Sequence, residues 1–218
     1  SMAFPSPPMD SLMPIPMDTL IDGFTTIYNP EKYSYVERKP TSTRGRAVQV
    51  QVLVMYGGEI RADMRDQDKL IRIANCTPLL YEFGSDIITQ NAKEIDWSTY
   101  KLGKKGGLPL LPVIFVVHVT SPQLKYLGVA KQAIGADDVI AVEIRRALQA
   151  ASRKLKKHVT MLQKGEAAGK ARKYLETHAE VVASTLNKML RANKERVYML
   201  MIEEIHRRRP IYKKEGDA

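Results

Sequence analysis

The stretch LLPVIFVVHVTSPQLKYLGVAKQAI, residues 110–134, opens with a nearly unbroken run of β-branched and aromatic residues from Val113 to Val119. Such a run is typical of a strand that is buried on both faces. The polar loop Thr120–Gly128 follows and leads to Lys131 in a short turn that contains alanine and isoleucine. A lysine near the start of a short helix is usually a solvated charge, although the helix dipole there disfavours a cation. The function therefore depends on what Lys131 contacts.

Length and composition fit one domain with an appendage. The chain has 218 residues, of which 44% are hydrophobic, enough for one core. No apolar run reaches the roughly 18 residues of a transmembrane helix, so we expect no membrane association. Ser1 and Met2, followed closely by prolines, lack the features of a signal peptide. We expect them to be cloning residues and the chain to be a piece of a larger protein.

The cysteine content and the distribution of charge further limit the class of protein. The single cysteine, Cys76, excludes an internal disulfide and a thiolate cluster, and we expect a small buried residue in an intracellular protein. The net charge of +10 is uneven, because residues 151–218 hold 17 Lys and Arg against 8 Asp and Glu, a balance of +9. This basic segment predicts contact with nucleic acid or an acidic protein surface, with a long solvated helix as the alternative.

The N-terminal part reads as a linker followed by a helix. Five prolines between residues 3 and 19 remove backbone donors, so residues 1–15 form an extended linker. Apolar residues at helical spacing predict an amphipathic helix over Pro16–Tyr28. The passage between Asn29-Pro30 and Lys39-Pro40, which contains Tyr33 and Tyr35, is expected to consist of turns.

The central part predicts an α+β domain. Alternation over Ala47–Tyr56 and over Lys69–Asn75 indicates two strands, and antiparallel pairing of these two is the simplest arrangement. Pro78–Tyr81 is a short extended segment, and Gly84–Ile95 is a helix capped by Ser85 or Asp86. With the strand Val113–Val119, these elements form a two-layer sandwich of sheet and helices.

The C-terminal part is helical. One helix runs from Asp138 to Gln163, capped by Asp137 or Asp138, and Gly165 is expected to break it. A second tract, Glu166–Arg209, carries one apolar stripe and would extend on the order of 60 Å as a single rod. The alternative is a hairpin that folds back near Asn187 or Asn193. We therefore divide the chain into linker 1–15, domain 16–164, helical arm 165–209 and tail 210–218.

Catalytic motifs are scarce. The four histidines are scattered without HExxH spacing or partner cysteines, so we expect no metal site, and His118 reads as a satisfied core imidazole. No GxSxG elbow or paired-carboxylate motif occurs. The lysines and glycines at 104–107 lack the strand, GxxxxGK[ST] and helix context of a nucleotide loop. We expect this chain alone to catalyse no reaction.

Several segments carry a resemblance to one family. They are YGGEI at 56–60, RIANCTPLLYEFGSDIIT at 72–89, DWSTY at 96–100, HVTS at 118–121 and KQAIG at 131–135. In this order and spacing they resemble the transducer domain of the B subunit of DNA topoisomerase VI, whose pattern includes R-x-A-N-x-x-P-L-L-Y and a lysine just before a helix. Residues 6–24 resemble the linker and first helix of that domain, and residues 170–186 the start of its C-terminal arm.

The resemblance implies a fold and a function. The fold would be a sheet and helix layer with a left-handed βαβ crossover, as in GHMP kinases and the second domain of a small-subunit ribosomal protein, followed by a long C-terminal helix. The family's B subunit also has a GHKL-type ATPase domain, which binds most of the ATP and Mg²⁺. It works in an A2B2 enzyme that passes one DNA duplex through another. This chain alone would need no cofactor.

The resemblance also implies site residues and partners. Lys131 corresponds by position to the family's switch lysine, which contacts the γ-phosphate of ATP. The partners would be the A subunit, a second B subunit when ATP binds, and double-stranded DNA. The compartment would be the cytoplasm of an archaeon or the nucleus of a eukaryote. The apolar residues that we expect to face a partner on the C-terminal helix, with core packing or self-association as alternatives, are Met189, Leu190, Val197, Leu200, Met201 and Ile205.

Two other functions stay open from the sequence. Arg207, Arg208 and Arg209 with the basic tail could contact phosphates, which would make the chain a nucleic-acid-binding module. Steep loss of binding with added salt would identify it. The chain could instead be a B-like structural partner of a meiotic DNA-cleaving protein that no longer uses ATP. The sequence that precedes Ser1 would distinguish this case by the presence or absence of an ATPase signature.

Overall fold

The computed structural model describes residues 12–43, 46–104, 106–127 and 133–208. Its main sheet has the strand order β1-β3-β6-β4-β5, and β2 pairs with β3. The strands are β1 (Lys32–Glu37), β2 (Thr41–Thr43), β3 (Arg46–Tyr56), β4 (Leu70–Ala74), β5 (Thr77–Pro78) and β6 (Val113–Thr120). A small second sheet pairs β7 (Tyr126–Leu127) with β8 (Ala133–Ile134).

The predicted central strand is confirmed, but its neighbours differ from the prediction. All eight residues of β6 are buried. β6 pairs antiparallel with β3, from Gln49↔Thr120 to Tyr56↔Val113, and parallel with β4, from Leu70↔Phe115 to Ala74↔Val119. The predicted antiparallel pair of β3 and β4 is therefore wrong, because β6 lies between them. The connection from β4 to β6 includes α3, whereas its left-handed crossover stays a prediction.

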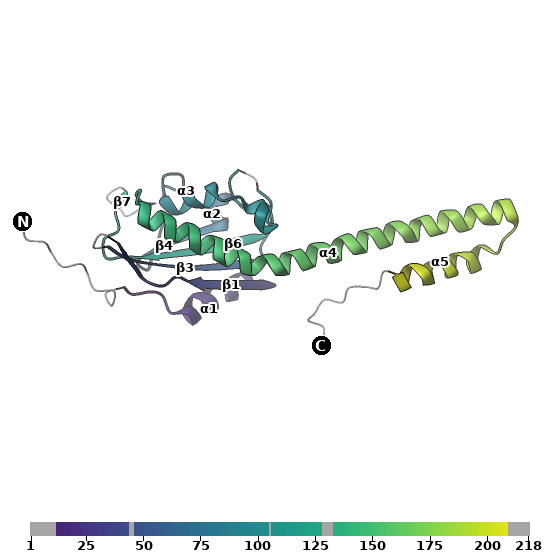
Figure 1. Cartoon of the computed structure of the whole chain (residues 1–218), viewed down its shortest axis with the longest axis horizontal. Helices are drawn as coiled ribbons and strands as arrows, with labels where there is room; N and C mark the ends of the chain where they lie inside the picture. Colours follow the sequence, from purple (N-terminus) through teal and green to yellow (C-terminus); the bar gives the residue numbers. More distant parts are fainter. Residues whose placement is uncertain (1–11, 44–45, 105, 128–132, 209–218) are drawn as a thin grey trace, which may run out of the picture. The chain divides into compact units, whose positions relative to one another are not determined.

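Helices cover both faces of the sheet (Figure 1). α1 (Met17–Tyr28) packs through Leu20 on Leu53 and Val116. On the opposite face, the ring of Trp97, in the short helix η2 (Trp97–Tyr100), lies 4.9 Å from that of Phe115. Successive strand residues point to opposite faces of the sheet. Phe115 and Val116 are consecutive in β6, so they face different helix layers. All residues of β3 from Ala47 to Met55 are buried, so both faces of this strand are covered.

The expected α+β fold with a long C-terminal helix is thus confirmed. The helix α3 (Ile87–Glu94) begins after the predicted cap Asp86, and α4 (Asp138–Leu190) begins after Asp137. Near its start α4 is held on the sheet by Glu143, whose carboxylate accepts a hydrogen bond from Arg38 at 2.9 Å. The short helix α2 (Asp66–Lys69) precedes β4.

Three local predictions are wrong. The passage expected to be turns contains β1, because Tyr33, Tyr35 and Val36 favour a strand and pair with β3. Cys76 is exposed rather than buried, because it lies in the tight β4–β5 turn with φ +65°. Gly165 does not break the helix, since α4 continues through it. A helical glycine costs only about 1 kcal/mol relative to alanine, and good helix formers follow it.

The contacts divide the chain into two compact units, residues 1–158 and 159–218. In the second unit, the end of α4 and α5 (Lys194–Arg208) form a hairpin. Glu176 on α4 accepts a hydrogen bond from His206 on α5 at 3.1 Å, and Asn187 donates to the backbone oxygen of Ala192 at the turn. The single rod predicted for Glu166–Arg209 is therefore wrong, and the hairpin alternative is correct. Arg191 has φ +53° and directly follows the last residue of α4, where the chain turns toward α5.

Candidate functional site

Lys131 lies outside the described residues, but the chain on both sides of it is described. β7 and β8 pair antiparallel, with Tyr126 opposite Ile134 and Leu127 opposite Ala133, and residues 128–132 connect them. The backbone N–H of Gly135 donates to the carbonyl of Lys125 at 2.6 Å. A Cβ on Gly135 would lie 3.2 Å from Leu127 Cδ2, so the hairpin closes tightly here. The predicted start of the following helix at Asp138 is confirmed.

Asn75 holds the start of this segment. Its side chain donates from Nδ2 to the Ser121 carbonyl at 2.8 Å and accepts from the Ser121 N–H at 2.9 Å. Asn75 itself has φ +43°, a left-handed conformation that asparagine tolerates better than most residues. Because the side chain pairs with both backbone groups of Ser121, it extends the sheet pairing past the end of β6.

Asp86 holds the other end. One carboxylate oxygen accepts from the N–H of Ile134 in β8 at 2.8 Å. The other accepts from Ile88 and Thr89 and so caps α3. The Asp86 side chain is fully buried, and this burial raises its pKa. One carboxylate thus fixes β8 and the start of α3 together.

Arg72 supports this carboxylate from β4. Its Nη1 lies 3.6 Å from Asp86 Oδ1, and its Nη2 donates to the carbonyls of Leu79 and Tyr81 at 2.9 and 3.1 Å. The guanidinium also lies over the Phe83 ring, 5.0 Å from its centroid. Burial lowers the pKa of Arg72, against the attraction of Asp86. Arg72 and Asp86 therefore form a buried charge pair between β4 and the start of α3.

Sequence reasoning missed the roles of Arg72, Asn75 and Asp86. All three lie in residues 72–89, the longest segment that carried the family resemblance. Asp86 was predicted only as a helix cap, which is confirmed. Its bond to Ile134 joins residues 48 positions apart, so local spacing could not reveal it. The R-x-A-N pattern of the family resemblance was the available signal, because Arg72 and Asn75 are two of its members.

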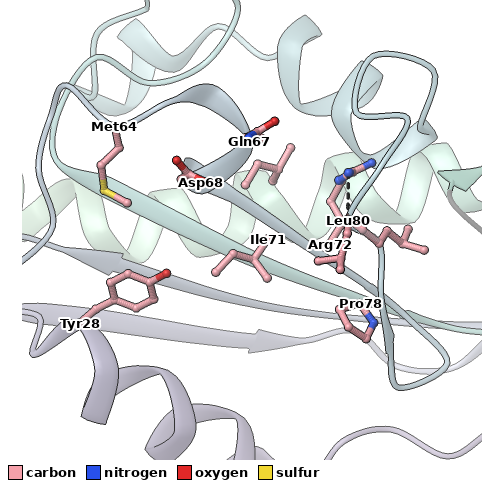
Figure 2. A pocket seen from close by; sticks show the side chains of 10 residues that line it. Tyr28, Met64, Gln67, Asp68, Ile71, Arg72, Pro78 and Leu80 are labelled. Atoms are coloured by element: carbon pink, nitrogen blue, oxygen red, sulfur yellow. Dashed lines mark hydrogen bonds between the residues drawn. The ribbon is translucent and has the colours of Figure 1, made fainter.

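A shallow groove of about 370 Å³ lies beside β4 (Figure 2). Figure 2 shows mainly apolar side chains around it, with the Arg72 guanidinium bonded to Leu79.

Within the described part of the chain, no group of three His, Cys, Asp or Glu side chains could hold a metal ion. In the same residues, no helix is both long and apolar enough to cross a membrane.

The predicted partner-facing residues separate into two groups on the helical hairpin. Val197, Met201 and Ile205 are half-buried on α5, and Ile205 lines a small pocket with Leu175 of α4. Ile205 therefore lies between the two helices. The other three are exposed, at 60–75% of their surface, and they are Met189, Leu190 and Leu200. A role in partner binding stays a prediction.

Two of the three arginines predicted to contact phosphates form ion pairs within the chain. Glu204 forms ion pairs with Arg207, at 2.5 Å, and with Arg208. The third arginine of the prediction, Arg209, lies outside the described residues. The two pairs are exposed, so they contribute little stability, but they offset the local positive charge.

Comparison with known proteins places these features in a family. The family described as "Topoisomerase VI B subunit, transducer" matches residues 7–172. The B subunit of type 2 DNA topoisomerase 6 from Thermococcus kodakarensis is 35% identical over 187 residues, covering 85% of this chain and 32% of the relative. The corresponding protein from Methanothermobacter thermautotrophicus is 31% identical over 210 residues, covering 95% and 39%.

The described residues thus form an α+β domain in which Asn75 bonds to Ser121 and Asp86 bonds to Ile134, one on each side of the β7–β8 pair. The chain belongs to the topoisomerase VI B subunit transducer family, which confirms the resemblance seen in the sequence. It spans 32–39% of the length of these relatives. Among solved structures, the DNA gyrase B subunit from Myxococcus xanthus matches 62% of this chain and 38% of its own, with 17% identity and a TM-score of 0.40.

Proposed function

We propose that this chain is the coupling region of a topoisomerase VI B subunit, which links ATP binding and hydrolysis to DNA cleavage and duplex passage by an A subunit. The observation that supports this most directly is the pair of anchors, Asn75 at Ser121 and Asp86 at Ile134, on the segment that contains Lys131. A lysine that must meet a phosphate on another domain needs such fixed ends. Without them, ordering the loop would oppose the contact entropically.

Lys131 acts as a sensor of the γ-phosphate in this proposal. ATP and Mg²⁺ are held mainly by the part of the protein outside this chain, and the triphosphate supplies the charge that Lys131 meets. A lysine ammonium is a compact positive charge, and a charge-assisted hydrogen bond to phosphate is stronger than a neutral one. Loss of that phosphate removes the contact. The hairpin anchors then transmit the change to the sheet, because they bind it to β4, β6 and α3.

The exposed apolar group Met189, Leu190 and Leu200 is our candidate for contact with the A subunit. Large exposed apolar side chains are enriched at protein interfaces when they form a contiguous patch. DNA and a second B subunit remain partners proposed from the family. Since Glu204 engages two of the three arginines, no observation favours the separate nucleic-acid module.

Substitution Lys131→Ala in the full-length B subunit, assembled with its A subunit, tests the proposal. We expect ATP binding to be largely retained, because the other phosphate contacts lie elsewhere in the protein. We expect ATP hydrolysis and strand passage to fall by about tenfold or more, since a hydrogen bond to a charged group contributes about 1.5–3 kcal/mol. Steady-state ATPase and supercoil-relaxation assays measure the two rates.

Lys125→Ala is the matched control, because Lys125 lies on the same hairpin and contributes its backbone carbonyl rather than its side chain. We expect near wild-type rates from this variant. If Lys131→Ala also hydrolyses ATP and passes strands at wild-type rates, the sensor role is excluded.

A further inference from the structure

A second polar cluster lies on the α1 face of the sheet and centres on Gln51. The Gln51 side chain, only 2% exposed, faces the N-terminal segment Leu12–Pro16, which we call the incoming segment. Gln51 Nε2 donates to the Ile15 carbonyl at 2.8 Å, and Gln51 Oε1 accepts from the Ile15 N–H at 3.2 Å. Gln51 therefore pairs with a backbone as a neighbouring strand would.

The remaining capacity of Gln51 is also used. Its Nε2 donates to the Tyr35 hydroxyl at 2.7 Å, and its Oε1 lies 2.6 Å from His118 Nδ1. An amide has two N–H donors and two oxygen lone pairs, so all four are engaged. The opposite amide orientation would set donor against donor at Ile15. The pairing with Ile15 thus fixes which Gln51 atom faces His118.

The Gln51 orientation determines the tautomer of His118. Because Gln51 Oε1 can only accept, the imidazole proton must reside on Nδ1, and Nε2 keeps its lone pair. Two donors lie within reach of that lone pair, the Cys76 N–H at 3.4 Å and the Thr120 hydroxyl at 3.2 Å. His118 is fully buried, and burial lowers its pKa to about 4, so the ring is neutral at pH 7.

The cluster connects distant parts of the domain. Ile15 is 36 residues from Gln51, and Cys76 is 42 residues from His118. Cys76 is in the β4–β5 turn, directly after Asn75, whose side chain holds Ser121. The hydrogen bonds therefore run from the incoming segment, across β3 and β6, to the turn that anchors the Lys131 segment.

We propose that Gln51 and His118 are positioning residues that form a tautomer-dependent relay between the incoming segment and the β4–β5 turn. Docking of Ile15 orients Gln51, Gln51 keeps the imidazole proton on Nδ1, and Nε2 then accepts from Cys76. When Gln51 is not held, the Nδ1 proton leaves to water and another enters at Nε2, with no change in net charge. Nε2–H and Cys76 N–H then face each other as two donors, and the turn loses its support.

The relay deepens the proposed function by naming a route from the incoming segment to the anchor at Asn75, and its meaning for coupling rests on that function. Its chemistry can be tested on this chain alone. If Lys131→Ala leaves the enzyme rates unchanged, the proposed function fails while the relay stands. If His118 carries its proton on Nε2, the relay fails while the proposed function stands.

The test measures the tautomer by long-range ¹H–¹⁵N correlation of the His118 ring at pH 7, and the exchange rate of the Cys76 amide. We expect the Nδ1–H form in the wild-type chain. In Gln51→Met, of similar size but without the amide, we expect the Nε2–H form. Cys76 exchange should become about two- to tenfold faster, as expected for one lost hydrogen bond.

Gln49→Met is the matched control. Gln49 lies two residues away on the same face of β3 and bonds to Glu37 at 2.6 Å rather than to Ile15 or His118. We expect its His118 tautomer and Cys76 exchange to match the wild type. An Nε2–H ring in the wild type would overturn the relay even if Gln51→Met did not fold. Unchanged Cys76 exchange in a folded Gln51→Met would overturn it as well.

Discussion

Replacing Asp86 by alanine is expected to lower the free energy of unfolding by about 3–5 kcal/mol, the usual cost of removing one partner from a buried charge pair. The loss has three parts. The Arg72 guanidinium, 3% exposed, would keep its charge without a carboxylate. The N–H groups of Ile88 and Thr89 would lose their cap, and the N–H of Ile134 its acceptor. Urea unfolding followed by circular dichroism measures the change.

Asp137→Ala is the comparison for Asp86→Ala. Asp137 caps α4 with the same pattern, accepting from Val139 and Ile140, and it is only half-buried. Loss of a helix cap costs about 1 kcal/mol. In the double variant Arg72→Met/Asp86→Ala the uncompensated charge is gone, so its loss should be smaller than the sum of the two single losses. An Asp86→Ala effect no larger than that of Asp137→Ala would contradict this account.

Acidification is expected to destabilise the domain through His118. Burial lowers the pKa of this imidazole from 6.5 to about 4, so between these values the unfolded chain binds a proton that the folded chain does not. Stability from His118 is therefore complete above pH 6.5 and is lost as the pH falls toward 4. The loss reaches roughly 3 kcal/mol for the full difference in pKa.

This pH dependence is measured as the unfolding free energy of wild type and His118→Gln between pH 4 and 7. The difference between the two should shrink as the pH falls, because only the wild type has the imidazole. Val117→Ala, a fully buried neighbour on β6 without a titratable group, serves as the control. Its stability should stay a constant amount below that of the wild type. Parallel curves for His118→Gln would disprove the contribution of His118.

The sequence predicted elements better than it predicted neighbours. Period-2 alternation located β3 and β4, and an apolar run located β6, because these patterns follow from which faces are buried. Neither pattern identifies the adjacent strand. β4 pairs with β6 through backbone hydrogen bonds that do not depend on residue type. The sequence pattern therefore could not distinguish β6 from β3 as the neighbour of β4, and the predicted antiparallel pairing with β3 was wrong.

The residues around His118 likewise separate into features that the sequence predicted and contacts that it did not. His118 was predicted as a satisfied core imidazole, which its contacts confirm. Its partner Gln51 reads in the sequence only as one polar member of an alternating strand. The contacts that give both residues a role come from Ile15 and Cys76, 36 and 42 positions away. Such contacts depend on the closure of the sheet and leave no local periodicity.

Residues 110–134, with their neighbours, illustrate what each source contributes. The sequence by itself determined a buried strand, a following polar segment and the family to which the chain belongs, since burial and ordered motifs are written in residue types. Only the tertiary structure decided that Asn75 and Asp86 hold the two ends of the segment that contains Lys131. The reason is physical: a side chain chooses backbone partners by proximity in the folded sheet, and their distance along the chain carries no signal of it.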